Sequence, residues 1–335
     1  MNKISDDILF KVEKPARYIG GELNCCYKDI DKIDIRFAFC FPDVYEVGMS
    51  HLGSRILYHV LNERVDTYCE RAFAPWPDME KQMRDNDIAL YALESKDPLN
   101  KFDFLGFTLQ YEMSYTNILN MLDMSGITIR ASKRGEDEPI IMAGGPCAYN
   151  PEPLYDIVDF FELGDGEEIM NEVLDVYKNH KGTKKEFLRE ISKIRGVYVP
   201  SLYDVSYNDD NTICEFKPKY DDVPSSVKKR FVVDFDKVAY PEKIVVPYTE
   251  IVHDRVILET FRGCTNGCRF CQAGMIYRPV REKSTATLID EADKLLKSTG
   301  YREISLSSLS ICDYSDIKNL VTTLIEKNKA DHVSV

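Results

Sequence analysis

The chain has 335 residues, 44% of them hydrophobic and 30% charged, with a formal net charge of -13 at pH 7. This length exceeds the usual size of one hydrophobic core, so we expect two domains, with one large α/β domain as the alternative. No apolar run approaches the roughly eighteen residues of a membrane span, so a membrane protein is not expected. The negative charge opposes nonspecific attraction to phosphates, so nucleic-acid binding is not indicated.

The N-terminal segment has acidic residues where a secretory signal would be basic and then continuously apolar. We therefore expect a cytoplasmic protein. Its ten cysteines should stay reduced in that compartment, which makes a cysteine cluster a metal or catalytic site rather than a disulfide framework.

Residues 34–185 alternate between β-type and helix-type runs. The predicted strands are 35–42, 88–93, 104–110, 139–145 and 158–164. The predicted helices are 49–64, 77–85, 116–126 and 166–181, each with apolar residues at three- and four-residue spacing. This alternation predicts a doubly wound, mainly parallel five-stranded sheet with helices on both faces.

Glycines follow the last two predicted strands of this sheet. Because ligands bind beyond the carboxyl ends of parallel strands, Gly144, Gly145, Gly164 and Gly166 are expected at one sheet edge, placed for close approach to a ligand. The alternative is that they only form tight turns from strand to helix.

Residues 186–249 are less regular, with a predicted hairpin at 204–218. A second α/β pattern begins near residue 255. Its predicted elements are a strand at 256–263, a helix at 284–300 capped by Ser284 or Thr285, a strand at 302–310, a helix at 315–330 capped by Ser315, and the start of a third strand at 332–335.

The predicted third strand coincides with the end of the sequence. A parallel strand left as a bare edge invites association. We therefore expect a truncated product, inactive when tested alone, or a partner that supplies the rest of the sheet.

Three cysteines follow the predicted strand 256–263 with the spacing C-x3-C-x2-C, at Cys264, Cys268 and Cys271. Thiolates at this spacing suit an iron–sulfur cluster, and three of them leave one iron of a [4Fe-4S] cluster open. Zinc is the alternative, with Cys312 or His253 as fourth ligand. Gly263 and Gly267 give the loop the backbone freedom to turn three side chains inward.

The run RVILETFRGCTNGCRFCQAGMIYRPVREKS, with Phe270 before the last cysteine, resembles the signature of the radical S-adenosylmethionine (SAM) superfamily. The resemblance implies a cluster loop after the first strand of a partial (β/α)6 barrel, with SAM bound to the open iron and cleaved to a 5'-deoxyadenosyl radical. It implies that Phe270 packs near the adenine and that Ser307 and Ser308, at the end of the second strand, contact the SAM amino group.

The run MAGGPCAYNPEPLYDIVDFFELGDGEE resembles the end of the cobalamin-binding-like N-terminal domain of a largely uncharacterised group of these proteins. Cobalamin domains with a histidine ligand to cobalt carry D-x-H-x-x-G, which is absent because Asp43 and His51 are too far apart. Binding without a histidine, in a crevice lined by the four glycines, stays open. The expected organisation is a cobalamin-binding-like domain at 1–185, a β-rich connector at 186–249 and the start of the radical SAM barrel at 250–335.

The resemblance implies an enzyme that needs a [4Fe-4S] cluster, SAM and a reductant such as flavodoxin or ferredoxin, and that uses its radical on an unknown substrate, with cobalamin as an optional second cofactor. No catalytic residue is assigned. The alternatives are a cobalamin-binding or regulatory module with a vestigial barrel, and an iron–sulfur protein without turnover.

Overall fold

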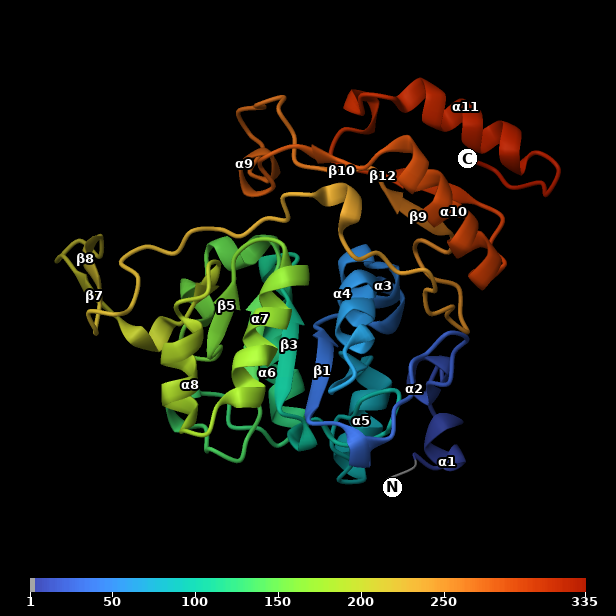
Figure 1. Ribbon diagram of the computed structural model, residues 1–335. Helices are drawn as coiled ribbons and strands as arrows, with labels where there is room; N and C mark the ends of the chain where they lie inside the picture. Colours follow the sequence, from blue (N-terminus) through green and yellow to red (C-terminus); the bar gives the residue numbers. More distant parts are fainter. Residues whose placement is uncertain (1–3) are drawn as a thin grey trace.

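The computed structural model describes residues 4–335, and its larger part is a six-stranded sheet in the order β2-β1-β3-β4-β5-β6 (Figure 1). The strands are β1 (Ile35–Phe41), β2 (Thr67–Phe73), β3 (Phe104–Thr108), β4 (Ile140–Gly144), β5 (Phe160–Glu162) and β6 (Val197–Tyr198). The first five run parallel, and β6 pairs antiparallel with β5. The chain crosses from β2 back over β1 to β3, so the order reverses beside β1, where doubly wound sheets bind ligands.

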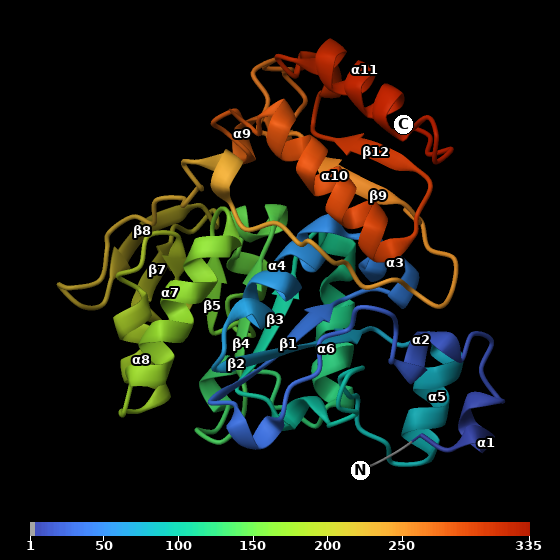
Figure 2. The same cartoon turned by 45° about the vertical axis from the view of Figure 1, so that its right-hand side comes forward.

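Helices cover both faces of this sheet (Figures 1 and 2). One face carries α4 (Leu52–Glu63) and α7 (Gly166–Asn179), which pack against each other, with α8 (Lys184–Ile191) beside α7. The other face carries α5 (Pro77–Asp85) and α6 (Tyr115–Met124). The remaining short helices of the N-terminal part are α1 (Asp6–Leu9), α2 (Ala16–Ile19) and α3 (Tyr45–Ser50). The predicted doubly wound, mainly parallel sheet is confirmed.

One strand prediction for this sheet was wrong, and one strand was not predicted. The run 88–93 forms no strand: its buried apolar side chains lie on a loop whose backbone bonds to Met124, Asp97 and Arg71. Strand β2 was not among the predicted strands, and its sequence carries the charged residues Glu70 and Arg71. In the fold both are buried, and Glu70 pairs with Arg36 at 2.6 Å. With β6 added, the sheet has six strands rather than five.

The segment after α8 contains the predicted hairpin, formed by β7 (Tyr203–Tyr207) and β8 (Ile213–Pro218). Tyr203 stacks on Phe216 across the pair, with ring centroids 4.8 Å apart. The chain then runs, largely without helices or strands, along the sheet domain to the C-terminal part (Figure 1).

The C-terminal part is built on one βαβ unit. Its elements are β9 (Val256–Glu259), β10 (Phe261–Arg262), α9 (Ala273–Ile276), β11 (Arg281–Glu282), α10 (Thr285–Thr299), β12 (Ile304–Ser307) and α11 (Ile317–Asn328). Strands β9 and β12 pair in parallel, with α10 as the crossover. At the far end, Ser334 makes a single parallel bridge to Glu303, where the third strand was predicted to begin.

Of the two predicted caps, Ser284 is confirmed, since its side chain accepts the Thr287 backbone N–H. Ser315 is wrong: Asp316 occupies the N-cap of α11, and the Ser315 hydroxyl instead donates to Glu282. The acceptor on the neighbouring strand β11 holds this hydroxyl away from the helix end.

The C-terminal part docks onto α4 (Figure 2). Ile56 and Val60 of α4 belong to the same buried cluster as Leu258, Leu288 and Ile304. This apolar contact sets β9 and β12 above the carboxyl edge of the large sheet. Among residues 4–335, no helix is both long enough and apolar enough to cross a membrane.

Candidate functional site

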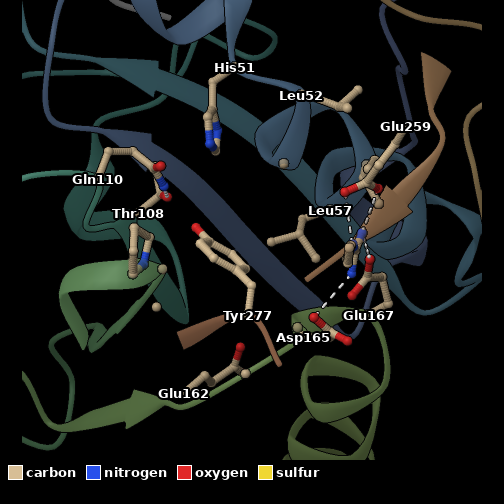
Figure 3. A pocket seen from close by; sticks show the side chains of 18 of the residues that line it. His51, Leu52, Leu57, Thr108, Gln110, Glu162, Asp165, Glu167, Glu259 and Tyr277 are labelled. Atoms are coloured by element: carbon tan, nitrogen blue, oxygen red, sulfur yellow. Dashed lines mark hydrogen bonds and ion pairs between the residues drawn. The ribbon is translucent and has the colours of Figure 1, made fainter. Parts of the chain in front are cut away.

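A pocket of about 380 Å³ lies between the carboxyl edge of the large sheet and the C-terminal part (Figure 3). From the sheet side it is lined by four predicted glycines, Gly144, Gly145, Gly164 and Gly166. From the other side it is lined by Ser307 and Ser308, at the end of β12, and by Gly263, the residue before Cys264. Residues predicted on two separate domains thus share one cavity.

The glycines also fit the alternative explanation, that they form tight turns from strand to helix. Gly145 and Gly164 have φ values of 101° and 127°, where side chains are strongly disfavoured. A Cβ atom on Gly164 would lie 1.7 Å from the Arg230 carbonyl oxygen. The same turns place their backbone in the pocket wall, so these glycines both form the turns and line the pocket.

The cysteine loop begins at the rim of this pocket. Cys264, Cys268 and Cys271 are all free thiols, with Cys268 exposed and the other two half-buried. The Cys271 N–H donates to the Cys268 carbonyl, and Gly263 and Gly267 have φ values of 92° and 64°. Cysteine thiolates are the ligands of iron–sulfur clusters, so three free thiols on one loop are a chemically suitable set of donors.

As the loop stands, the structure does not bring the three thiols together. Within residues 4–335, no group of three His, Cys, Asp or Glu side chains is close enough to hold a metal ion. Cluster binding would therefore draw the thiols inward. The Asn266 amide ties the loop to the Asp313 carboxylate at 2.8 Å, next to exposed Cys312.

Phe270 lies outside the pocket, with 92% of its surface exposed. Its packing against adenine stays a prediction. His253 lines a second hollow, of about 630 Å³, which shares His51, Thr108 and Ser307 with the first pocket. The two hollows form one crevice along the junction of the two parts of the chain.

A buried ion network that the sequence analysis did not predict closes one side of the pocket. The Arg262 guanidinium pairs with Glu167 at 2.6 Å, Glu259 at 2.9 Å and Asp165 at 3.2 Å (Figure 3). Asp165 also pairs with Arg281. Burial raises the pKa of Asp165, but the two arginines outweigh it and hold that pKa below its usual range. The network links α7 to β9 and β10.

His51 faces the pocket from the start of α4 (Figure 3). Its Nδ1 accepts the Ser54 backbone N–H at 3.1 Å, so the ring caps the helix. Burial lowers the pKa of His51 to about 4, so the ring is neutral at pH 7. With Nδ1 used as an acceptor, the proton of the neutral ring sits on Nε2, which makes that nitrogen a donor rather than a metal ligand.

Glu162, the last residue of β5, points into the pocket (Figure 3). It is 4% exposed, and its Oε1 is buried without a hydrogen-bond partner among the described residues. Burial, reinforced by the Glu167 carboxylate, raises the pKa of Glu162 to about 8. The side chain is therefore a neutral acid at pH 7. The sequence signal was an acidic residue between Phe161 and Leu163, at the end of the predicted strand 158–164.

Glu162→Gln is expected to change how stability depends on pH. The folded chain keeps the Glu162 proton up to a pKa of about 8, whereas the unfolded chain releases it near 4.5. Between these values the folded state binds more protons, so Glu162 makes wild-type stability fall as pH rises, by at most about 1.4 kcal/mol per pH unit. Denaturant unfolding at pH 5, 6.5 and 8 should show Glu162→Gln gaining stability relative to wild type.

The matched control is Glu326→Gln, because Glu326 is an exposed carboxylate on α11. Its stability difference from wild type should stay nearly constant over the same pH range. A constant difference for Glu162→Gln as well would mean that Glu162 ionises normally in the folded protein.

Comparisons with known proteins match both parts of the chain. The family model described as "Radical SAM proteins, N-terminal" matches residues 53–200, and that of the radical SAM superfamily matches residues 258–335. A relative, the uncharacterized protein MJ0966 of Methanocaldococcus jannaschii, is 26% identical over 290 residues, covering 86% of this chain and 52% of the relative.

Two solved structures of TsrM, a radical SAM methyltransferase from Kitasatospora setae, share the fold. The one with tryptophan and a SAM analog matches with a TM-score of 0.51 at 13% identity, covering 88% of this chain. The one with cobalamin and a [4Fe-4S] cluster gives 0.51 at 11% identity and covers 89%. The chain spans about half the length of these relatives, 52% in each case. With both family models matched in order along it, the chain is a radical SAM superfamily protein that carries the N-terminal domain of these proteins.

Proposed function

We propose that Cys264, Cys268 and Cys271 hold a [4Fe-4S] cluster that binds SAM at its open iron. The bound cluster would supply the electron that cleaves SAM to methionine and a 5'-deoxyadenosyl radical, which abstracts hydrogen from a substrate not yet identified. The donor set supports this: three free thiols on one loop, with no fourth cysteine inside it.

One observation carries the proposal: the crevice joins the two domains at the cysteine loop. Gly263, Ser307 and Ser308 line the same pocket as the glycine turns of the sheet. In our proposal the two serines contact SAM on the β12 side. The buried Arg262 network closes the pocket wall, which helps to exclude water from a reactive radical.

Within the same proposal the sheet side of the crevice binds cobalamin. This rests on the crevice at the strand-order reversal and on the fold shared with TsrM, whose structure contains cobalamin. His51 would not coordinate cobalt, because its Nδ1 is the helix cap and its ring is neutral with the proton on Nε2. The electron donor would be a flavodoxin or ferredoxin.

The test of the SAM site is equilibrium binding. Anaerobically reconstituted protein should bind about one SAM per chain, since one iron is left open. Cys268→Ala should abolish this binding, and Cys214→Ala, which removes an exposed thiol of the hairpin, should leave it unchanged. A reconstituted cluster that binds no SAM would contradict the proposal and favour an iron–sulfur module without turnover.

Titration with hydroxocobalamin tests the second cofactor. We expect a change in its visible spectrum on binding, and we expect the spectrum of the bound form to be the same in His51→Ala. That variant loses the cap of α4, which costs about 1 kcal/mol of stability, so it is tested well below its unfolding temperature. A bound spectrum that differs in His51→Ala would show that this histidine ligates cobalt after all.

A further inference from the structure

The inference concerns Glu162, a buried acid that neither the cluster nor SAM uses in the proposal above. Its Oε1 has no hydrogen-bond partner among residues 4–335, and its Oε2 would lie 3.4 Å from a Cβ atom added to Gly166, at the start of α7. Buried polar groups in native proteins are nearly always hydrogen-bonded, because an unpaired one costs about 1–3 kcal/mol. A side chain of this kind, aimed into a pocket, points to a partner on the ligand.

The charged and titratable groups around the pocket leave Glu162 without a cation. Arg262 is engaged by Asp165 at the N-cap of α7, by Glu167 on α7 and by Glu259 on β9. His51, from α4, is neutral. Tyr277, which follows α9, is a phenol whose pKa burial raises further. Among residues 4–335 Glu162 therefore faces no unpaired positive charge, and it stays protonated at pH 7 because burial raises its pKa to about 8.

A protonated carboxyl group presents one O–H donor and one carbonyl acceptor side by side. A primary carboxamide presents the complementary pair, an N–H donor beside a carbonyl acceptor, so the two groups can form two parallel hydrogen bonds. An anionic ligand group would be repelled by the carboxylates of Glu167 and Asp165. An ammonium group would instead select the ionised form of Glu162.

We propose that Glu162, as a neutral acid, is a ligand-positioning residue that pairs with a primary carboxamide of the molecule bound in the crevice. The inference rests on the proposed binding of cobalamin, whose corrin ring carries carboxamide side chains. It adds which residue of this chain recognises that ligand and in which protonation state.

The test is equilibrium dialysis of the whole chain with cyanocobalamin, whose axial ligand does not titrate between pH 6 and 10. Wild-type affinity should fall about tenfold between pH 6.5 and 9.5, because ionisation of Glu162 removes its O–H donor. Loss of one hydrogen bond between neutral groups weakens binding by about this factor. Glu162→Gln keeps a donor beside an acceptor and should bind with wild-type affinity at pH 6.5 and without this pH dependence. Glu162→Ala should bind about tenfold more weakly at pH 6.5.

The outcomes separate this inference from the proposed function. No binding by wild type at any pH would overturn this inference together with the proposed cobalamin site, whereas the cluster and SAM site have their own test. Binding with the same affinity and pH dependence in wild type, Glu162→Gln and Glu162→Ala would overturn only the role of Glu162. Wild-type affinity that rises above pH 8 and is lost in Glu162→Gln would mean that the ionised carboxylate, not the neutral acid, binds the ligand, which also overturns the proposed pairing. Circular dichroism verifies folding, and Glu162→Gln carries the test if Glu162→Ala does not fold.

Discussion

Replacing any one of Cys264, Cys268 and Cys271 by alanine is expected to reduce the iron and sulfide of anaerobically reconstituted protein from about four of each per chain to near zero. Each thiolate holds a different iron of the cluster, so two cannot replace three. The thiols are not yet grouped in the structure, so loss of one also removes a contact that would draw the loop 264–271 inward. Iron and acid-labile sulfide assays, with the visible absorption of the cluster, measure the result.

Two controls define what the loss means. Cys214→Ala should retain full iron content, because this exposed thiol lies on β8 in the hairpin. Cys312→Ala should also retain it, although Asn266 ties the cysteine loop to the neighbouring Asp313. Loss of iron in Cys312→Ala would make Cys312 a fourth ligand and leave no iron open for SAM. One tightly bound zinc without labile sulfide would overturn the cluster assignment itself.

Periodicity and strand–helix alternation were sufficient to predict most of the sheet. β1, β3, β4 and β5 lie within their predicted runs, and α5 has the predicted bounds. These elements carry their apolar residues in the pattern that burial requires. The apolar pattern did not predict β2, because its charged residues Glu70 and Arg71 are buried by pairing with residues distant in the sequence. Arg71 pairs with Glu22 at 2.9 Å and Glu94 at 2.6 Å, which no local pattern reports.

The candidate site was predictable where it depends on backbone or on motif spacing. The strand-to-helix glycine turns, at Gly144 and Gly164, reached one pocket because the carboxyl ends of parallel strands meet at one edge. The serines at the end of β12, which belongs to a separate two-stranded sheet, line the same pocket. Arg262 and Glu162 were not predictable in this way. Their roles depend on which side chains the docking of the C-terminal part brings opposite them, and that docking rests on Ile56 and Val60 of a helix about 200 residues earlier.

Arg262 is expected to be the most sensitive single position for the contact between the two parts of the chain. Arg262→Met keeps the apolar stem but leaves the carboxylates of Asp165, Glu167 and Glu259 buried without this cation. Removing one partner of a buried ion network costs about 3–5 kcal/mol, since the remaining charges stay uncompensated. Urea unfolding should show this loss, and Arg189→Met, at an exposed pair with Asp222, should change stability far less, because water screens exposed ion pairs.

Two optical signals can show which part of the chain Arg262→Met destabilises. The only tryptophan, Trp76, lies before α5 on the large sheet domain, whereas far-ultraviolet circular dichroism reports both parts of the chain. If Arg262 couples the two parts, the two signals should share one midpoint in wild type and separate in Arg262→Met, with the circular dichroism transition starting at lower urea.

A double variant tests whether the loss comes from uncompensated charge. Adding Glu167→Gln to Arg262→Met removes one of the stranded carboxylates, so the double variant should recover about 1–2 kcal/mol relative to Arg262→Met. In the wild-type background Glu167→Gln should instead destabilise, because it breaks the 2.6 Å contact with Arg262. If Glu167→Gln stabilises Arg262→Met but destabilises wild type, the charges of the network hold the two parts of the chain together at the crevice. Destabilisation in both would mean that Arg262 contributes by packing, for example against the Phe235 ring 4.8 Å from its guanidinium carbon.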